Sequence, residues 1–427
     1  MLDLVLTSQT NIKLVMMTLL AVSSALLYWY VYDKKHEPKI YKILIAAGII
    51  LRIIVCLAFY NLHPDLDSLS SDVNNYYYPG VQKIIEGEIP YRDFDTRYSL
   101  FFLPLFVIPV LIWNSLGAIV LTMIAIEAGM IRIYLRWRRN KNELNGYRTA
   151  FLYLFSPISF YWVAVVGYNS GIIAFFLLLA IILAEKNKPW LAGIAAAGSF
   201  LFCKFIALMA WPGLAFYSLK GYFKRTVPMA LSVLLPFTLL IFKLDFLHPL
   251  KMELGNNTGG NIWFIISALI PGFQHGFIYN QIPYPLIMLV FLAVFTLYLN
   301  RIRSLDNTSP DNTTRSIAFI TLIFFIFMTL SIKSFQMYLP MILIFLTHLL
   351  VNKFPRSKWA LIFLAYIGSI TFYEVIMFEF IRDHQLYSLF NSEVLKVFIL
   401  DTGLLAAYLY YILKCWNIIF PGNVKSN

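Results

Sequence analysis

Apolar runs recur along the whole length of this 427-residue chain. Each run is about 15–22 residues long, which is the length that an α-helix needs to cross the ~30 Å hydrocarbon core of a bilayer. Hydrophobic residues make up 60% of the chain and charged residues only 13%, and the mean hydropathy is +0.71. These features predict an all-α, polytopic membrane protein with about 12–14 transmembrane helices.

The polar stretches between the runs contain no Gly/Ser-rich, Pro-rich or low-complexity linker. We therefore expect a single membrane-embedded domain over residues 1–427. Three segments are too polar to span a membrane, namely 62–98, 244–281 and 380–396. The expected helices lie near 12–32, 42–61, 99–113, 117–136, 148–166, 170–184, 190–203, 205–219, 227–243, 282–299, 316–331, 335–351, 358–378 and 397–413.

The formal net charge of +12 comes from Lys and Arg residues that sit at helix ends rather than in one stripe. This distribution favours anionic membrane lipids as the partner and argues against nucleic acid. The three cysteines, Cys56, Cys203 and Cys415, each lie in an apolar run without metal-ligand spacing, so we expect them to pack in the core.

Two basic clusters bear on the topology. Residues 33–42 carry four lysines, which predicts a cytoplasmic loop and places 62–98 on the external face. Residues 132–148 should also be cytoplasmic, but they fall outside if both 99–113 and 117–136 cross the membrane. Either one of these two segments is only partly inserted, or the second cluster is an exception to the positive-inside bias.

The loop that follows the second helix is unusually rich in charged and aromatic residues for this chain. In "SDVNNYYYPGVQKIIEGEIPYRDFDTRYSLFFLP", apolar residues recur at helical spacing, which predicts an interfacial element. We expect a turn over 72–78, then a helix that starts near Pro79 and stops at Gly87. Asp72 opens this element, either as a simple helix N-cap or as a carboxylate that faces the headgroup level.

The second half of the loop combines arginines with tyrosines. Arg92 and Arg97 offer fork-shaped donors for a phosphate, and Tyr91 and Tyr98 offer aromatic faces for a sugar ring. The alternative is internal pairing of the arginines with the loop's own aspartates. The residues alone leave both interpretations open.

Other candidate residues interrupt apolar stretches or lie in the second polar segment. Lys204 and Lys333 are costly in such surroundings unless they are paired or reach the interface, so both are candidates for binding a phosphate. Trp263 belongs to 244–281, where we expect an interfacial helix with this side chain as an anchor or stacking surface. The histidines of that segment lack metal-ligand spacing, and no metal site is expected.

Several motifs along the chain resemble one known group of enzymes. They are the Tyr-rich element after Asp72, "GEIPYRDF" with "YSLFFLP" before the next helix, "SPISFYWVAVVGYNSG", "GSFLFCKFIALMAWP" and "SIKSFQMYLPMIL". In this order they resemble the GT-C superfamily of integral-membrane glycosyltransferases, and most closely the polyprenyl-phosphate-mannose-dependent mannosyltransferases of the phosphatidylinositol-mannoside and GPI types. Asn169 stands where that family often has an acid or Gln.

The resemblance implies transfer of a hexose, with mannose expected, from a polyprenyl-phosphate-sugar to a lipid or glycan acceptor at the external face. Asp72 would be the general base, and the phosphate would leave with inversion at the sugar carbon. Arg92, Arg97, Lys204 and Lys333 would bind the donor phosphate. The sugar or acceptor would contact Tyr76, Tyr91, Tyr98, Asn169, Trp263 and Tyr338. No cofactor is expected, and a divalent cation is not indicated.

Two other functions compete with this interpretation. The first is a transporter or flippase of a lipid-linked saccharide, which inverted repeats and broken helices in matching halves would favour. The sequence shows no convincing internal repeat. The second is a sugar polymerase or ligase, which would be expected to depend on a larger late loop than 244–281.

Overall fold

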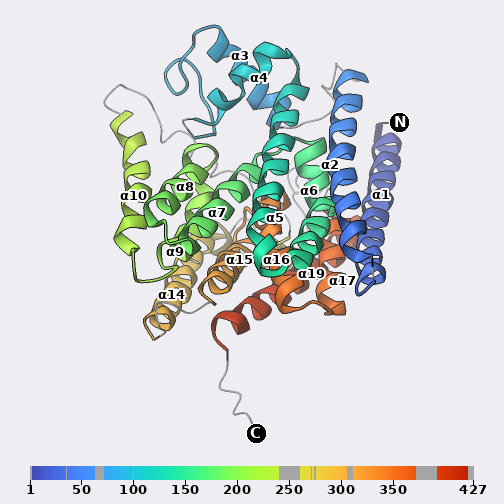
Figure 1. The fold of residues 1–427 in the computed structure, drawn as a ribbon. Coiled ribbons are helices and arrows are strands. Elements are labelled where there is room, and N and C mark those ends of the chain that lie inside the picture. The colour runs from blue at the N-terminus through green and yellow to red at the C-terminus, as the bar shows by residue number, and fades with distance from the viewer. Residues whose placement is uncertain are drawn as a thin grey trace. The chain divides into compact units, whose positions relative to one another are not determined.

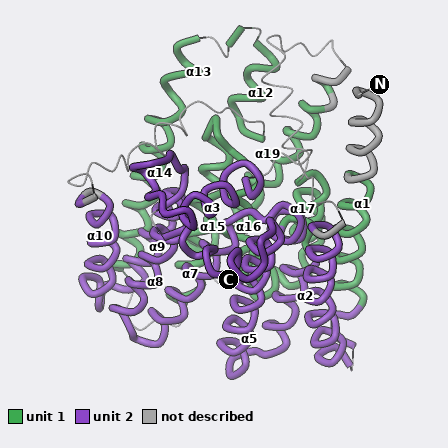
Figure 2. The backbone as a smooth tube through the Cα atoms, turned by 90° about the horizontal axis from the view of Figure 1, so that it is seen from above, with its two compact units in different colours: residues 1–30, 156–158, 256–427 green, residues 31–155, 159–255 purple. Residues whose placement is uncertain are grey.

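The computed structural model describes residues 2–34, 36–62, 72–99, 101–239, 260–270, 272–273, 276–304, 311–371 and 392–421 (Figure 1). Within these ranges the chain is helical and holds no β-sheet, only an isolated bridge between Pro90 and Phe94. The predicted all-α class is confirmed. The chain forms two compact units, coloured separately in Figure 2, and each is described by itself.

Unit 2 comprises Val31–Phe155 and Ser159–Gly255, and it contains most of the predicted site residues. Its long helices α2 and α5 pack against each other, α7 packs on α8, and α10 packs on α8. The elements are α2 (Glu37–Leu62), η2 (Val73–Tyr77), α3 (Tyr78–Ile85), η3 (Leu103–Phe106), α4 (Val107–Ile112), α5 (Leu116–Leu154), η4 (Phe160–Val165), α7 (Ser170–Glu185), α8 (Pro189–Leu201), η5 (Phe205–Ala210), α9 (Trp211–Ala215) and α10 (Tyr222–Leu239).

Unit 1 comprises Met1–Tyr30, Ser156–Ile158 and Asn256–Asn427. Its core forms around α15, which is buried along most of its length and packs against α19, α16 and α14. The elements are α1 (Leu2–Val31), α12 (Ile262–Leu269), α13 (Phe277–Gln281), α14 (Pro283–Arg303), α15 (Asn312–Leu330), η8 (Gln336–Tyr338), α16 (Pro340–Lys353), α17 (Lys358–Ser369) and α19 (Ser392–Ile419). The short α6 (Pro157–Ser159) lies at the sequence boundary of the two units.

Local signals explain several of these helix ends. The Ser115 hydroxyl accepts a hydrogen bond from the Gly117 amide (3.1 Å) and caps α5, and the Asn261 side chain accepts one from the Phe264 amide (3.0 Å) and caps α12. Proline occupies the first turn of α8, α14 and α16, where its missing amide proton costs nothing. Asn142 leaves the helical region (φ −156°, ψ 89°) and kinks α5.

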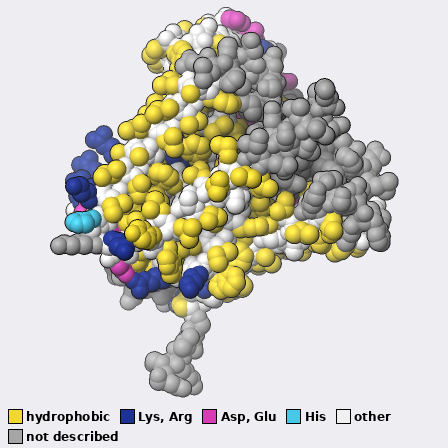
Figure 3. Space-filling model, turned by 90° about the vertical axis from the view of Figure 1, so that its right-hand side faces the viewer, with side chains coloured by type: hydrophobic (Ala, Val, Ile, Leu, Met, Phe, Trp, Pro, Cys, Tyr) yellow, Lys and Arg dark blue, Asp and Glu magenta, His cyan; other side chains and the backbone are white. Residues whose placement is uncertain are grey.

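The helices identify a multi-pass integral membrane protein. Six helices of the described residues are long and apolar enough to span a membrane, or seven if the bent pair Pro157–Val165 and Ser170–Glu185 (116°) is one span. Apolar side chains cover much of the face shown in Figure 3, while Lys and Arg side chains gather away from its middle. The described residues thus hold six or seven spans, against the 12–14 expected for the whole chain, and five other apolar helices in these ranges have only 10–17 residues.

The helix lengths agree with the first of the two topologies left open by the basic clusters, in which 99–113 is only partly inserted. Residues 103–112 fold as η3 and α4, which together are about 15 Å long at 1.5 Å per residue and too short to cross the bilayer. The apolar runs expected at 117–136 and 148–166 lie in two helices that meet within α5 at the non-helical Asn142. The second helix folds back on the first, because a Cβ at Gly146 would lie 2.9 Å from the Arg138 side chain. Arg148 Nε lies 2.6 Å from Glu37 Oε1 and Lys42 stacks on Tyr147, so both clusters lie at the same end of the α2–α5 pair.

Candidate functional site

The element that begins at Asp72 is helical from its first residue. A π-helix (Val73–Tyr77) continues into α3, where we expected a turn and then a helix, and the chain leaves α3 at Gly87 with φ +93°. The N-cap interpretation of Asp72 is wrong, because its side chain makes no capping hydrogen bond and its backbone is already helical (φ −57°, ψ −28°). The carboxylate is therefore available for other contacts.

The Asp72 carboxylate faces two tyrosines and a lysine. Its Oδ2 accepts a hydrogen bond from the Tyr98 hydroxyl (2.7 Å) and a longer one from the Tyr77 hydroxyl (3.5 Å). The Lys204 Nζ lies 3.9 Å from the same oxygen. All these contacts involve Oδ2, and Oδ1 makes no hydrogen bond or ion pair with the described residues. The side chain retains 24% of its solvent exposure.

Backbone pairing brings Tyr98 and Lys204 together although they are far apart in sequence. The Ser99 amide donates to the Cys203 carbonyl (3.1 Å), and the Phe101 amide donates to the Leu201 carbonyl (3.1 Å). These bonds attach the end of the loop to the end of α8. Lys204 has an extended backbone between α8 and η5 (φ −150°, ψ 158°), which lets its side chain leave the helical register.

An aromatic cluster surrounds this group. Tyr77 packs edge-on against Tyr98 and Phe102, with ring centroids 4.8 Å apart in both cases. The Lys204 ammonium lies 4.8 Å from the Tyr98 ring centroid and 4.9 Å from that of Tyr168, and it donates to the Tyr168 hydroxyl at 2.8 Å. Aromatic faces and a hydroxyl oxygen thus offset part of the cost of burying this cation.

Burial and charge set the protonation of the group. Burial raises the pKa of the Tyr98 phenol well above its usual range, and the negative charge of Asp72 raises it further. The same two causes raise the pKa of Tyr77. Burial lowers the pKa of the Lys204 ammonium, and Asp72 opposes this effect. Both phenols therefore remain neutral hydrogen-bond donors at physiological pH.

Arg97 provides a second cation near Lys204. Its guanidinium carbon lies 4.5 Å from the centroid of the Tyr76 ring, and its positive charge contributes to lowering the pKa of Lys204. The Nε atom of Arg97 is buried and has no hydrogen-bond partner among the described residues. A planar guanidinium with unused donors suits an oxyanion such as a phosphate.

The break between η4 and α7 completes the site. Gly167 has φ +71°, and a Cβ at this position would lie 2.7 Å from the Val73 side chain and 2.6 Å from that of Val120. Asn169 is 1% exposed, and neither its amide oxygen nor its amide nitrogen finds a partner in the described part of the chain. Its carbonyl accepts from the Cys203 thiol at 3.3 Å, which places it beside the residue that precedes Lys204.

Two other predicted loop residues have structural contacts. Arg92 pairs with its neighbour Asp93 (2.7 Å) in an exposed position, as the alternative of internal pairing anticipated, and this bond holds the pKa of Asp93 at about 2. Tyr91 is buried with φ +66°, and its hydroxyl donates to the carbonyl of Tyr98. Tyr91 thus supports the backbone of Tyr98.

The remaining three candidates belong to unit 1. Lys333 is buried, with its ammonium 5.6 Å from the centroid of the Phe335 ring. Trp263 is buried in α12 and donates from Nε1 to the carbonyl of Leu330. Tyr338 is buried and packs edge-on against Phe335 (5.8 Å). Their assignment to a common site with Asp72 stays a prediction.

Sequence reasoning does not single out Tyr77 and Tyr168 as site residues, although both contact the Asp72–Lys204 pair. Helical spacing assigns Tyr77 only to an apolar face, and Tyr168 has no distinguishing feature beside Asn169. Their position in the sequence could have drawn attention to them, because Tyr77 follows Tyr76 and Tyr168 precedes Asn169, and both of these neighbours are predicted site residues. The buried cysteines are confirmed as core residues.

Four polar residues near the predicted site segments lie outside the described ranges, namely Asp65 and Asp67 before Asp72, and His248 and His275 in the second polar segment. Within the described ranges, no three His, Cys, Asp or Glu side chains gather closely enough to hold a metal ion.

Comparisons with protein-family models, with curated proteins and with solved structures yield no match to this chain.

Proposed function

We propose that this protein is a membrane glycosyltransferase that moves a hexose from a polyprenyl-phosphate-sugar to a lipid or glycan acceptor. The observation that carries this proposal is the Asp72 carboxylate, with one oxygen held by Tyr98 and Lys204 and the other without a hydrogen bond or ion pair to the described residues. A base fixed by such contacts is oriented for a defined direction of proton transfer. The resemblance to GT-C motifs implies the same role for this aspartate.

The charges around Asp72 suit a donor with a phosphate leaving group. Lys204 and Arg97 supply two positive charges beside one carboxylate, so a phosphate would restore neutrality. Arg97 keeps unused guanidinium donors, and the Asn169 amide keeps both polar atoms unused among the described residues. Tyr76 is 36% exposed and adds aromatic surface of the kind that packs on sugar rings, whereas Tyr77 and Tyr98 are buried and offer only their hydroxyls to the site.

The position of the site fits a lipid-linked donor. The basic clusters lie at the Glu37 end of α2, and Asp72 follows the opposite end of this 26-residue helix. A helix of this length rises about 39 Å and crosses the whole hydrocarbon core. The positive-inside bias then favours an external face for the site, at headgroup level, where a polyprenyl phosphate presents its sugar.

The chemical steps follow from these contacts. Asp72 Oδ1 takes the proton of the acceptor hydroxyl while that oxygen attacks the anomeric carbon of the sugar. The bond between this carbon and the phosphate oxygen breaks on the opposite face, and its electron pair leaves with the polyprenyl phosphate. Arg97 and Lys204 stabilise the charge that develops on the leaving group, so a separate general acid is not needed.

A transfer assay in nanodiscs tests the proposal. The full chain is incubated with radiolabelled polyprenyl-phosphate-mannose and a membrane lipid extract as acceptor, beside the variants Asp72→Asn and Asp95→Asn. Loss of the general base should lower the rate by about 10²–10⁴-fold, whereas the exposed Asp95 should be replaceable. Equal rates for wild type and Asp72→Asn would remove Asp72 from the mechanism.

One observation favours a second candidate, a flippase of a lipid-linked saccharide. Helices η4 and α7 meet at an angle of 116°, and the break between them carries Gly167, Tyr168 and Asn169 next to Lys204. Broken helices line the binding sites of many transporters. Movement of a fluorescent lipid-linked sugar across proteoliposomes, unaffected by Asp72→Asn and without new glycosidic product, would support this candidate over transfer.

A further inference from the structure

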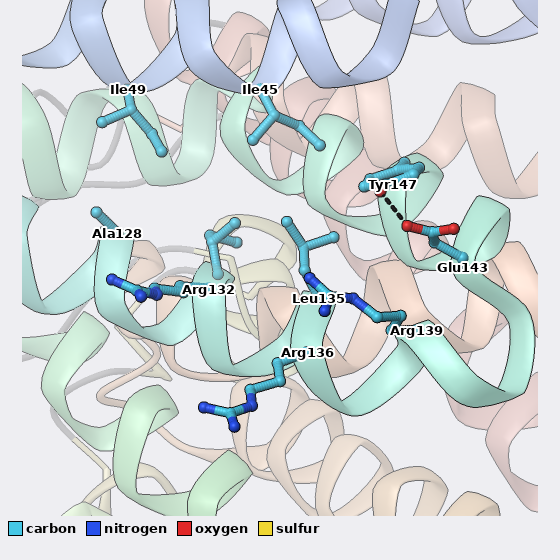
Figure 4. A pocket seen from close by; sticks show the side chains of 10 residues that line it. Ile45, Ile49, Ala128, Arg132, Leu135, Arg136, Arg139, Glu143 and Tyr147 are labelled. Atoms are coloured by element: carbon cyan, nitrogen blue, oxygen red, sulfur yellow. Dashed lines mark hydrogen bonds between the residues drawn. The ribbon is translucent and has the colours of Figure 1, made fainter. Parts of the chain in front are cut away.

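A second polar site lies at the other end of unit 2, where the basic clusters meet. Helices α2 and α5 enclose a cavity of about 440 Å³ (Figure 4). Its walls combine apolar side chains with three arginines from consecutive turns of α5. The lining residues are Ile45, Ile49, Ala128, Ile131, Arg132, Leu135, Arg136, Arg139, Glu143 and Tyr147.

The positive charge of this cavity is not neutralised by the protein. Arg132, Arg136 and Arg139 are exposed, and none of them forms a hydrogen bond or ion pair with a residue that the structure describes. Glu143 is the one acidic side chain among the ten lining residues, and it accepts a hydrogen bond from the Tyr147 hydroxyl. Three arginines against one glutamate leave a net charge of +2 for an anionic ligand to meet.

The apolar wall continues from the arginines toward the middle of the helix pair. Ile45 and Ile49 on α2 face Arg132 and Leu135 across the cavity, and Ala128 lies one turn before Arg132 (Figure 4). Arg132 follows the start of α5 by sixteen residues, or about 24 Å along the helix. The arginines therefore lie where α5 reaches the membrane interface, and the apolar wall lies deeper.

A neighbouring hollow extends the basic surface along α5. Arg136 and Arg139 border it together with Trp137, Asn140, Lys141, Glu185 and Lys186. Trp137 donates from Nε1 to Glu185, which also pairs with Lys141, so these three side chains satisfy one another. Tryptophan side chains such as Trp137 are enriched at membrane–water interfaces. The unneutralised charge remains on the three arginines.

We propose that the cavity between α2 and α5 binds an anionic membrane phospholipid. Arg132 and Arg139 hold its phosphate with Arg136 beside them, and one acyl chain lies along Ile45, Ile49 and Ala128. Guanidinium groups bind phosphate oxygens with paired hydrogen bonds, and the apolar wall distinguishes a lipid from a free anion. The site is separate from Asp72 and does not depend on the transferase proposal.

Native mass spectrometry of the full chain in detergent tests this inference. The protein is titrated with dioleoyl-phosphatidylglycerol, with dioleoyl-phosphatidylcholine and with inorganic phosphate. Each basic side chain at an anionic lipid surface strengthens binding by about fivefold, so Arg132→Gln/Arg136→Gln/Arg139→Gln should weaken phosphatidylglycerol binding at least tenfold. Phosphatidylcholine binding should be weaker in wild type and should change little in the variant.

Two further variants make the result specific. Lys220→Gln/Lys224→Gln/Arg303→Gln removes the same charge from exposed positions elsewhere and should leave phosphatidylglycerol binding intact. Ala128→Trp keeps all charges but fills the apolar wall, and it should weaken phosphatidylglycerol binding. An equal loss in the two charge variants, unchanged binding in Ala128→Trp, or phosphate binding as tight as that of the lipid would each overturn the proposal.

Discussion

Among the carboxylates of unit 2 that face a cation, Glu127 and Asp72 have instructively different surroundings. Glu127 Oε2 lies 2.9 Å from Arg52 Nε inside the α2–α5 pair, and both side chains are 1% exposed. Asp72 lies 3.9 Å from Lys204, with 24% and 10% of the two side chains exposed. The first pair is shorter and closed, and the second is longer and partly open.

The partners of the two cations sharpen the contrast. Arg52 also donates to the Ser159 hydroxyl (2.8 Å) and to the Gly48 carbonyl (3.3 Å), so it links α2 to another segment of the same unit. Lys204 instead contacts tyrosines, and the Asp72 side chain stays 24% exposed. The buried Arg52–Glu127 pair is inaccessible to a ligand and can contribute only to the fold. The partly exposed Asp72–Lys204 pair can also contact a ligand.

The largest expected effect comes from breaking the closed pair. Arg52→Met leaves Glu127 buried without its cation and should destabilise the protein by about 3–5 kcal/mol. Thermal unfolding in detergent measures this loss. Arg52→Met/Glu127→Leu removes both charges and should recover most of the stability, because no unpaired charge remains. A single variant as stable as wild type would show that the pair does not hold α2 and α5 together.

A smaller effect, on rate rather than stability, is expected at the open pair. Tyr98→Phe removes the 2.7 Å hydrogen bond to Asp72. Hydrogen bonds to a charged group contribute about 1.5–3 kcal/mol, so transfer should slow by roughly 10–150-fold. The melting temperature should change little, because the aromatic contacts of the ring remain. A Tyr98→Phe variant that transfers at the wild-type rate would mean that Asp72 is oriented by other groups.

The smallest effect is expected at an exposed pair in the same loop. Lys83 lies 3.9 Å from Glu88, with 45% and 38% of the side chains exposed. Exposed pairs contribute about 0–1 kcal/mol, so Lys83→Gln should alter the melting temperature only slightly and leave transfer unchanged. Differential scanning fluorimetry of Lys83→Gln and Arg52→Met under the same conditions compares the two losses of stability. A loss comparable to that of Arg52→Met would contradict the link between burial and stabilisation.

Hydropathy predicts the class of fold but not which apolar runs span the membrane. The runs 117–136 and 148–166 were expected to be separate helices, and two helices do meet within α5 at the non-helical Asn142, although the first continues through the basic stretch up to that residue. The run 99–113 contains Pro104 and Pro109 and breaks into two short helices. The hydropathy averaged over a window does not distinguish such an interrupted run from a membrane span. The average does not record where proline removes a backbone hydrogen bond.

Part of the candidate site is visible in the sequence for chemical reasons. Asp72, Arg97, Tyr98 and Lys204 are unusual residues for apolar surroundings, and the structure brings these four together in unit 2. Tyr77 does not stand out, because a tyrosine in a chain with 27 of them carries little information by itself. Which tyrosine hydroxyl faces the carboxylate depends on the helical phase, and the π-helix changes that phase.

The sequence by itself determined that this protein is built of apolar helices in a membrane, with its candidate reactive residues in and around a polar loop. Helix formation and membrane insertion depend on composition over about 20 residues, which can be read directly. Only the tertiary structure decided that Asp72 meets Tyr98 and Lys204, because the backbone bonds from Ser99 and Phe101 to the end of α8 join segments about a hundred residues apart. Such long-range pairing leaves no local periodic signal in the sequence.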